Sequence, residues 1–169
     1  MKKGYIAGKL FKEGDIRQRL YEEESLKKEI SNVKWHNPIN DPEANDKSKA
    51  PTAETIFNND CKKVLESNYI VAELDDEDPG TIAELFIAWT VNYFYELFEE
   101  GYTLEEIKEK IPYKDIYCHL SDIRQDSKGY EGIRLPWGIN QFVIGGLINN
   151  GKIMSNFKDI VEDISNKEK

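Results

Sequence analysis

The stretch "NYIVAELDDEDPGTIAELFIAW", Asn68 to Trp89, joins an apolar run, an acidic turn and a second apolar run. The first run is nearly continuous in Ile, Val and Leu, which predicts a strand buried on both faces, as in a parallel sheet. The Pro-Gly pair predicts a tight turn. The second run has helical spacing and predicts a long helix that ends at Gly101. A buried strand followed by a helix is the building unit of α/β folds.

The other elements repeat this unit along the chain. Further strands are expected at residues 4–8, 32–38, 115–120 and 152–154, and helices at 15–30, after the N-cap Thr52, within 135–151 and at the C-terminus. This alternation predicts a parallel sheet with helices on both faces. Such sheets bind ligands at the carboxyl ends of their strands. Here those ends are Gly8–Lys9, His36–Asn37, Leu74–Asp78 and Leu120–Arg124.

Length and composition predict one soluble domain, residues 1–169. Hydrophobic residues make up 39% of the chain and charged residues 33%, and the net charge is −9. This charge opposes binding to a nucleic-acid polymer, whose phosphates require Lys and Arg. No apolar run is long enough for a membrane span or a secretion signal, so a cytoplasmic protein is expected. Cys61 and Cys118 lie far apart and lack metal-ligand spacing, which favours free thiols.

Glu84 is the acidic residue whose position is hardest to explain by solvation. On the predicted helix it shares a face with Ile87, Ala88 and Val91. Glutamates are rarely buried without a partner, because desolvation of the charge is unfavourable. The first turns of a helix favour an anion, so the carboxylate is expected to stay ionised. From the residues alone, a functional and a structural role remain equally open.

Other candidates lie near the same strand ends. Asp60 falls between Ile56 and Val64 on the apolar side of its predicted helix, and Asp78 precedes the rigid Pro-Gly turn. Tyr5 lies inside the first strand, where a core aromatic is the simpler interpretation. Paired carboxylates suit glycosidic chemistry, in which one attacks the anomeric carbon and another manages the leaving-group proton. Sequence spacing does not fix the distance between them.

Together, several segments resemble the nucleoside 2-deoxyribosyltransferase family. They are "YIAGKLF" (5–11), "NND" (58–60), "DPGTIAEL" (78–85) and "PWG" (136–138). The resemblance implies a flavodoxin-like, doubly wound five-stranded parallel sheet with helices on both faces, and assembly as a homo-oligomer, a dimer or larger. It also implies transfer of a 2-deoxyribosyl group between nucleobases through a covalent glutamyl intermediate. Small nucleosides and nucleobases would be the ligands, and no cofactor or metal is expected.

The same resemblance implies a role for each candidate. Glu84 matches the nucleophile, Asp60 the acid that handles the nucleobase proton, and Tyr5 the group that orients the nucleophile. Asp78 matches the position that meets the 5′ end of the sugar. Relatives that hydrolyse nucleoside 5′-monophosphates carry serine there, and an aspartate favours a free 5′-hydroxyl because it repels phosphate.

The chain also departs from the family pattern. Lys9 replaces a proline of the first motif, and Ile133 or Arg134 stands where the family has an asparagine supplied by a neighbouring subunit. Asn140 is nearby and is predicted to bind substrate, as are Gly8 and Asn37 at the strand ends. Base specificity is expected from the region around His36 and Asn37 and from the polar loop 39–51, with His36 equally suited to a structural role.

Four other functions are weighed against the transferase. A hydrolase would use the same intermediate with water as acceptor, and a catalytically silent, nucleoside-sensing relative is also compatible with these residues. A phospho-acceptor domain needs acidic residues after the first strand, and an electron-carrying flavodoxin needs a hydroxyl-rich phosphate loop there. The first strand ends in Gly8-Lys9, which argues against the phospho-acceptor domain, and the segment "GKLFKEGD" (8–15) lacks the hydroxyls of a phosphate loop.

Overall fold

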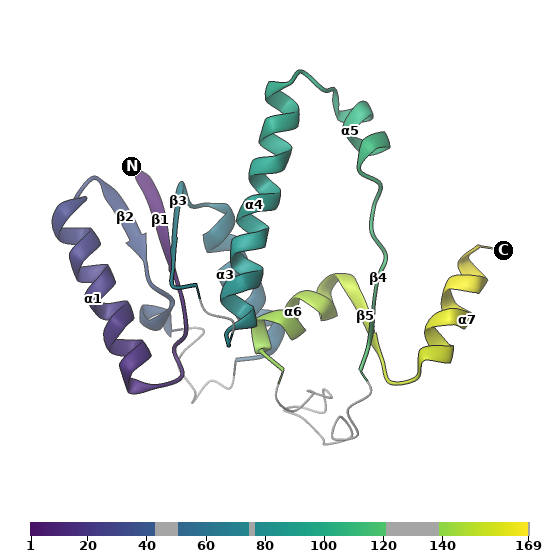
Figure 1. Ribbon diagram of the computed structural model, residues 1–169, viewed down its shortest axis with the longest axis horizontal. Coiled ribbons are helices and arrows are strands. Elements are labelled where there is room, and N and C mark those ends of the chain that lie inside the picture. The colour runs from purple at the N-terminus through teal and green to yellow at the C-terminus, as the bar shows by residue number, and fades with distance from the viewer. Residues whose placement is uncertain (43–50, 75–76, 121–138, 169) are drawn as a thin grey trace.

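The computed structural model describes residues 1–42, 51–74, 77–120 and 139–168. Within these ranges the chain has helices and five parallel strands in alternation, as predicted (Figure 1). The strands coincide with the five predicted segments. They are β1 (Lys2–Ala7), β2 (Val33–His36), β3 (Tyr69–Ala72), β4 (Ile116–His119) and β5 (Gly151–Met154).

The strand β1 is the centre of a three-stranded sheet with the order β2-β1-β3. Its Tyr5 is paired with His36 of β2 and with Ile70 of β3. Successive side chains of a strand point to opposite faces, so Tyr5 and Ile6 enter different cores. Tyr5 packs with Val64 on one face, whereas Ile6 packs with β2 residues on the other. Both side chains are fully buried.

Helices cover both faces of this sheet, which confirms that part of the prediction. Helix α1 (Glu13–Glu29) places Leu26 against the Ile6 core, and α3 (Ala53–Leu65) and α4 (Pro79–Glu99) cover the Tyr5 core. The predicted cap of α3 is confirmed, because the Thr52 hydroxyl accepts a hydrogen bond from the Thr55 amide. Gly101 follows α4 with φ +88°, a conformation that favours glycine at a helix end.

The second half of the described chain contains α5 (Leu104–Lys110), α6 (Gln141–Asn150) and α7 (Phe157–Lys167). The sequence did not predict α5, a short helix with a Thr103–Glu106 capping box. Helix α6 packs closely on α3, because Gly145 and Gly146 leave room for Ala53 and Phe57. A side chain at Gly145 would collide with the backbone of Ala53.

The expected single five-stranded sheet is wrong for the described residues, because β4 and β5 form a separate two-stranded sheet. Helix α4 continues for 21 residues away from the first sheet, and β4 returns beside α6 and α7 instead of beside β3 (Figure 1). The side chains of β3 pack on both faces, Ile70 and Ala72 against the Tyr5 core and Val71 against the Ile6 core, but they are half-buried and not fully buried as predicted. Among the helices within the described ranges, none is long and apolar enough to cross a membrane.

Candidate functional site

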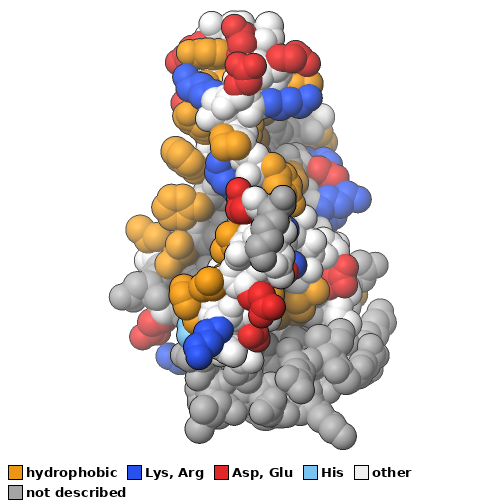
Figure 2. Space-filling view, turned by 90° about the vertical axis from the view of Figure 1, so that its right-hand side faces the viewer, with side chains coloured by type: hydrophobic (Ala, Val, Ile, Leu, Met, Phe, Trp, Pro, Cys, Tyr) orange, Lys and Arg blue, Asp and Glu red, His pale blue; other side chains and the backbone are white. Residues whose placement is uncertain are grey.

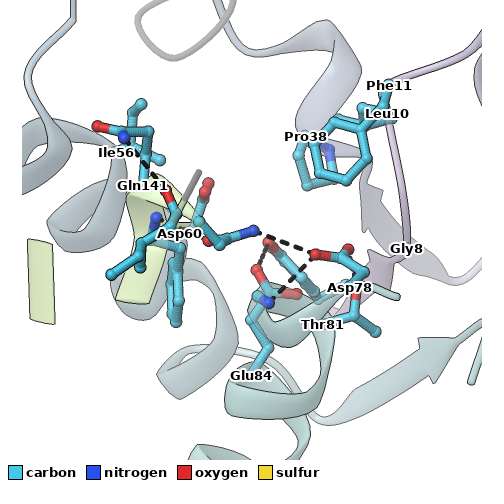
Figure 3. Close-up of a pocket in the computed structure, with 15 residues that line it drawn as sticks. Gly8, Leu10, Phe11, Pro38, Ile56, Asp60, Asp78, Thr81, Glu84 and Gln141 are labelled. Atoms are coloured by element: carbon cyan, nitrogen blue, oxygen red, sulfur yellow. Dashed lines mark hydrogen bonds between the residues drawn. The ribbon is translucent and has the colours of Figure 1, made fainter. Parts of the chain in front are cut away.

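A cavity of about 440 Å³ lies at the carboxyl end of β1, between the start of α4, the middle of α3 and the start of α6 (Figure 3). It brings together six of the seven predicted site residues and several that sequence analysis missed. The predicted residues are Tyr5, Gly8, Asp60, Asp78, Glu84 and Asn140, and the others are Leu10, Phe11, Pro38, Ile56, Gly80, Thr81, Ile139, Gln141 and Phe142.

Glu84 and Tyr5 form a buried hydrogen bond at the floor of this cavity. The Tyr5 hydroxyl donates to Oε1 of Glu84 over 2.6 Å. Tyr5 is fully buried and Glu84 is 7% exposed, so the pair is largely shielded from solvent. A hydrogen bond to a carboxylate in such surroundings is stronger than one at the surface. It fixes the direction in which the second carboxylate oxygen can act.

Burial raises the pKa of Glu84 to about 8, while the hydrogen bond from Tyr5 lowers it and the charges of Asp60 and Asp78 raise it. Glu84 is the sixth residue of α4, beyond the first turn where the helix dipole is effective. Desolvation therefore outweighs the help that the helix dipole was expected to give to the ionised form of Glu84. A small change in surroundings near neutral pH can switch its charge.

Asp60 lies on the buried side of α3, as its spacing predicted. It is 8% exposed, and burial together with Asp41 raises its pKa to about 7. Its Oδ1 is buried without a hydrogen-bond partner. Buried polar atoms are usually hydrogen-bonded, so an unpartnered oxygen beside a cavity is suited to meeting a ligand. A carboxyl with a pKa near 7 can both give and take a proton.

Asp78 is the N-cap of α4, and Asn140 is the N-cap of α6. Asp78 Oδ1 accepts from the Gly80 amide and from Asn140 Nδ2, both at 3.1 Å, and Oδ2 accepts from the Thr81 hydroxyl at 2.7 Å. The two helix starts are therefore tied together at the cavity wall. A carboxylate has about four acceptor positions, so Oδ2 keeps one for a further donor.

Gly8 and Arg19 shape the side of the cavity next to β1. A β-carbon on Gly8 would collide with the Arg19 guanidinium, and Gly8 has φ +154°. Arg19 is fully buried and forms ion pairs with Glu22 at 2.6 Å and Glu73 at 2.9 Å. Leu10, which lines the cavity, lies two positions after this glycine. Sequence analysis missed Arg19, because nothing in the charged pattern of α1 marks one arginine as buried.

Asn37 is the predicted site residue that the structure does not bring to the cavity. Its amide donates to the Arg19 carbonyl and to Glu23, and its Oδ1 accepts from the Ile39 amide. These bonds use the side chain to join β2 to α1 and to start a short 3-10 helix at Pro38. The following residue, Pro38, lines the cavity instead.

His36 also lies outside the cavity lining, but it contacts one of the site residues. Its ring stacks on Tyr5 with a centroid distance of 5.6 Å and an interplanar angle of 22°. Burial, together with Lys63, lowers the pKa of this histidine, and its Nε2 is buried without a hydrogen-bond partner. A neutral ring against Tyr5 supports the position of the hydroxyl that contacts Glu84.

Several predicted features lie outside the described residues. They are Ile133, Arg134 and the 136–138 segment, the greater part of the polar loop 39–51, and two acids of the turn, Asp75 and Asp76. In the described part of the chain, no group of three or more His, Cys, Asp or Glu side chains could hold a metal ion. Cys61 and Cys118 are free and half-buried.

Comparison with known proteins assigns neither a family nor a function to this chain. No family model and no curated protein matches the chain. A solved structure of a conserved protein from Enterococcus faecalis V583 is similar to it over 99% of both chains, with 23% sequence identity and a TM-score of 0.49. The chemistry of the cavity is therefore the basis on which a function is inferred.

Proposed function

We propose that the protein is a nucleoside 2-deoxyribosyltransferase, which moves a 2-deoxyribosyl group from one nucleobase to another. The observation that carries the proposal is the buried hydrogen bond from Tyr5 to Glu84 in a cavity that also contains Asp60. The cavity thus holds two carboxyl groups with raised pKa values, one with a hydrogen-bond donor and one with a free buried oxygen. The sequence resemblance assigns the same three residues to catalysis.

In the proposed reaction, Glu84 is the nucleophile. Its carboxylate oxygen attacks the anomeric carbon, the C–N bond breaks, and its electron pair passes to the departing nucleobase. Asp60 supplies the proton that this base takes up. The product is a covalent glycosyl ester on Glu84. In the second half, a nitrogen of another nucleobase attacks the same carbon, the ester bond breaks, and Asp60 accepts the proton of the incoming base.

The number of protons that this reaction requires on Glu84 and Asp60 fits their two raised pKa values. With values of about 7 and about 8, the pair holds about one proton slightly above neutral pH. Although Glu84 has the higher pKa, Tyr5 donates to its ionised form. Asp60 has no hydrogen-bond partner on its buried Oδ1, so it is the better site for the shared proton. One ionised carboxylate and one acid are then available together.

The proposed substrate carries a free 5′-hydroxyl, which Asp78 would bind. Its Oδ2 has acceptor capacity left after the bond to Thr81, whereas a phosphate in the same place would face a buried carboxylate. Leu10, Phe11 and Phe142 supply apolar surface on the cavity wall, which suits the faces of a flat nucleobase.

Base exchange is the direct test. The protein is incubated with each common deoxynucleoside and a second free base, and products are separated by chromatography. A new deoxynucleoside is expected, and Glu84→Ala should remove this activity, whereas the matched change Glu96→Gln on the exposed side of α4 should not. Absence of both exchange and base release, or full activity of Glu84→Ala, would overturn the proposal.

A covalent trap tests the intermediate itself. A 2-fluoro-2-deoxynucleoside should increase the intact mass by one fluorinated sugar and release the base, and peptide mapping should place the adduct on Glu84. An adduct without base exchange, together with free sugar from ordinary substrates, would assign water as the acceptor and replace the transferase by a hydrolase. An adduct on another residue would contradict the role of Glu84.

A further inference from the structure

Acidic side chains on the surface of the protein have basic neighbours. On the face shown in Figure 2, Asp and Glu side chains are interspersed with Lys and Arg. Around the β4–β5 sheet, Asp163 pairs with Lys152 at 2.6 Å, and Asp115 pairs with Lys167 at 2.8 Å. Hydrogen bonds from Lys152 and Tyr117 lower the pKa of Asp163, as expected for an acid beside a cation. The buried acids of the first sheet differ from these surface acids.

Four acids at the end of the first sheet that carries the cavity are more than nine-tenths buried: Asp41, Asp60, Asp78 and Glu84. Three of them line the cavity, and each has a role in its structure. Glu84 accepts a hydrogen bond from Tyr5, and Asp78 caps α4. Asp60 has a buried oxygen without a hydrogen-bond partner. Asp41 is not among the residues that line the cavity, so its buried carboxyl group needs another explanation.

Asp41 ends the short 3-10 helix η1 (Pro38–Asn40) and is held against α3. Its backbone amide donates to the Pro38 carbonyl over 2.9 Å, and its Oδ2 accepts from Asn59 Nδ2 over 3.0 Å. Asn59 directly precedes Asp60 in α3. An asparagine in place of Asp41 could form both bonds, because its amide oxygen is also an acceptor. The two bonds therefore fix the place of the side chain but do not explain its negative charge.

The charge of Asp41 acts on Asp60. Burial, and then Asp41, raises the pKa of Asp60 to about 7, because a second negative charge in the same buried region is unfavourable. For Glu84, burial is the main cause of the raised pKa, and the charges that raise it further are those of Asp60 and Asp78. Asp41 thus distinguishes the two carboxyl groups of the proposed reaction, because it favours a proton on Asp60.

Titratable side chains from four elements interact with Asp41, with Asp60 or with both. They are Tyr5 of β1, His36 of β2, Cys61 of α3 and Glu84 of α4. Three more charged groups act on the histidine, and these are Lys63, Lys34 and Glu23. Burial raises the pKa of Tyr5 and Cys61 and lowers that of His36, so these three groups are uncharged near neutral pH. Among these described side chains, Asp41 is the one whose charge raises the pKa of Asp60.

We propose that Asp41 is a positioning residue for the proton of Asp60: with its carboxylate held in place by Asn59, its negative charge keeps Asp60 in the acid form. In the function proposed above, on which this inference rests, Asp60 gives a proton to the departing base and takes one from the incoming base. Asp41 acts through Asp60 and does not meet the substrate. Without its charge, the shared proton moves toward Glu84, and a protonated Glu84 cannot attack the anomeric carbon.

The first experiment follows the proton of Asp60 directly, by carboxyl-carbon NMR of the full chain across pH, with the signal identified through Asp60→Asn. Its titration midpoint is expected at about 7. Asp41→Asn keeps the shape of the side chain but removes its charge, and should lower this midpoint by about one pH unit. Glu54→Gln, which removes an exposed carboxylate from the same helix as Asp60, is the matched control and should leave the midpoint unchanged.

Asn59→Ala is a second variant for the same measurement, because it keeps the Asp41 carboxylate but removes the bond that holds it. The midpoint of Asp60 should again fall, by a smaller amount. An unchanged midpoint in folded Asp41→Asn or, where that variant does not fold, in Asn59→Ala would overturn the proposal. The midpoint does not depend on activity, so a lowered midpoint in a protein without base exchange would refute the proposed function alone.

A second experiment tests whether this proton reaches the leaving group, at a pH above the pKa of Glu84, where Glu84 is ionised in every variant. Asp41→Asn should slow base exchange from deoxynucleosides by about tenfold, the factor that corresponds to one pH unit. It should leave the cleavage of a nitrophenyl deoxyriboside unchanged, because this leaving group departs without a proton. Asp41→Glu restores the charge and should recover part of the lost exchange. Equal losses with both donors would indicate a purely structural role for Asp41 and overturn the proposal.

Discussion

The Tyr5 hydroxyl and the Glu84 carboxylate are joined by a buried 2.6 Å hydrogen bond, although 79 positions separate the two residues in the chain. The bond connects the central strand β1 to the second turn of α4, so the position of Glu84 depends on the packing of both elements. Burial, and then the charge of Glu84, raises the pKa of Tyr5 well above its ordinary value, so Tyr5 keeps its proton and remains a donor. Tyr5 can therefore orient the Glu84 carboxylate whenever Glu84 is ionised.

Tyr5→Phe should reduce base exchange by about 10- to 100-fold, the effect expected for loss of a hydrogen bond to a charged group. Without this donor, the pKa of Glu84 rises further, so the acidic limb of the rate profile should move to higher pH. Exchange rates measured across pH give both the loss of activity and the shift of the acidic limb. Tyr95→Phe, at an exposed position of α4, is the control and should change neither. An unshifted profile in Tyr5→Phe would contradict the proposed role.

Stability should fall as pH rises from about 5 to 9, because Glu84 and Asp60 have raised pKa values of about 8 and about 7. Between their ordinary and raised values, the folded state binds more protons than the unfolded state, so the free energy of unfolding decreases with pH. Glu84→Gln removes one of these two titrating carboxyl groups. The decrease in the free energy of unfolding should then be smaller by several kcal/mol at pH 9, with little change near pH 4. Urea unfolding at a series of pH values measures this.

The control for this prediction is Glu96→Gln, which removes an exposed carboxylate from the same helix. Its unfolding free energy should follow that of the unchanged protein at every pH. If Glu84→Gln also follows the unchanged protein, the carboxyl is not buried in the way that the raised pKa requires.

Asp78→Ser should change substrate preference more than stability. Serine is as good an N-cap as aspartate, so the start of α4 should be retained within about 1 kcal/mol. Removal of the negative charge, and the gain of a hydroxyl donor, should improve the ratio of activity toward nucleoside 5′-monophosphates over nucleosides. The ratio of kcat/KM for the two substrates, compared with that of Thr81→Ser, measures this effect. An unchanged ratio would mean that Asp78 does not contact the 5′ end of the substrate.

Local patterns in the sequence predicted the strands, most helices and the side of the helix on which Asp60 and Glu84 lie. These features depend on periodicity and on capping residues such as Thr52, which act within a few positions. The separation of β4 from β3, the burial of Arg19 and the structural use of Asn37 depend on contacts between distant segments. For example, the spacing of charges along α1 contains no information about which arginine meets Glu73. No local rule could therefore predict these three features.

Gly8 and Arg19 should behave as a coupled pair in a double-mutant cycle. Gly8→Ala places a β-carbon against the Arg19 guanidinium and should destabilise the protein by about 1–3 kcal/mol. Arg19→Met keeps an unbranched side chain but leaves Glu22 and Glu73 without their cation. It should destabilise the protein by a similar amount. Since methionine lacks the guanidinium with which the added β-carbon would collide, the double variant should lose less than the sum of the two.

Urea unfolding of the four proteins gives the coupling energy, and Arg17→Met, at an exposed position of the same helix, is the control that should add independently to Gly8→Ala. Because Leu10 and Phe11 follow Gly8 and line the cavity, Gly8→Ala should also raise the KM for the donor nucleoside, and Arg19→Met should partly restore it. Strict additivity in both stability and KM would mean that Arg19 does not fix the loop after β1.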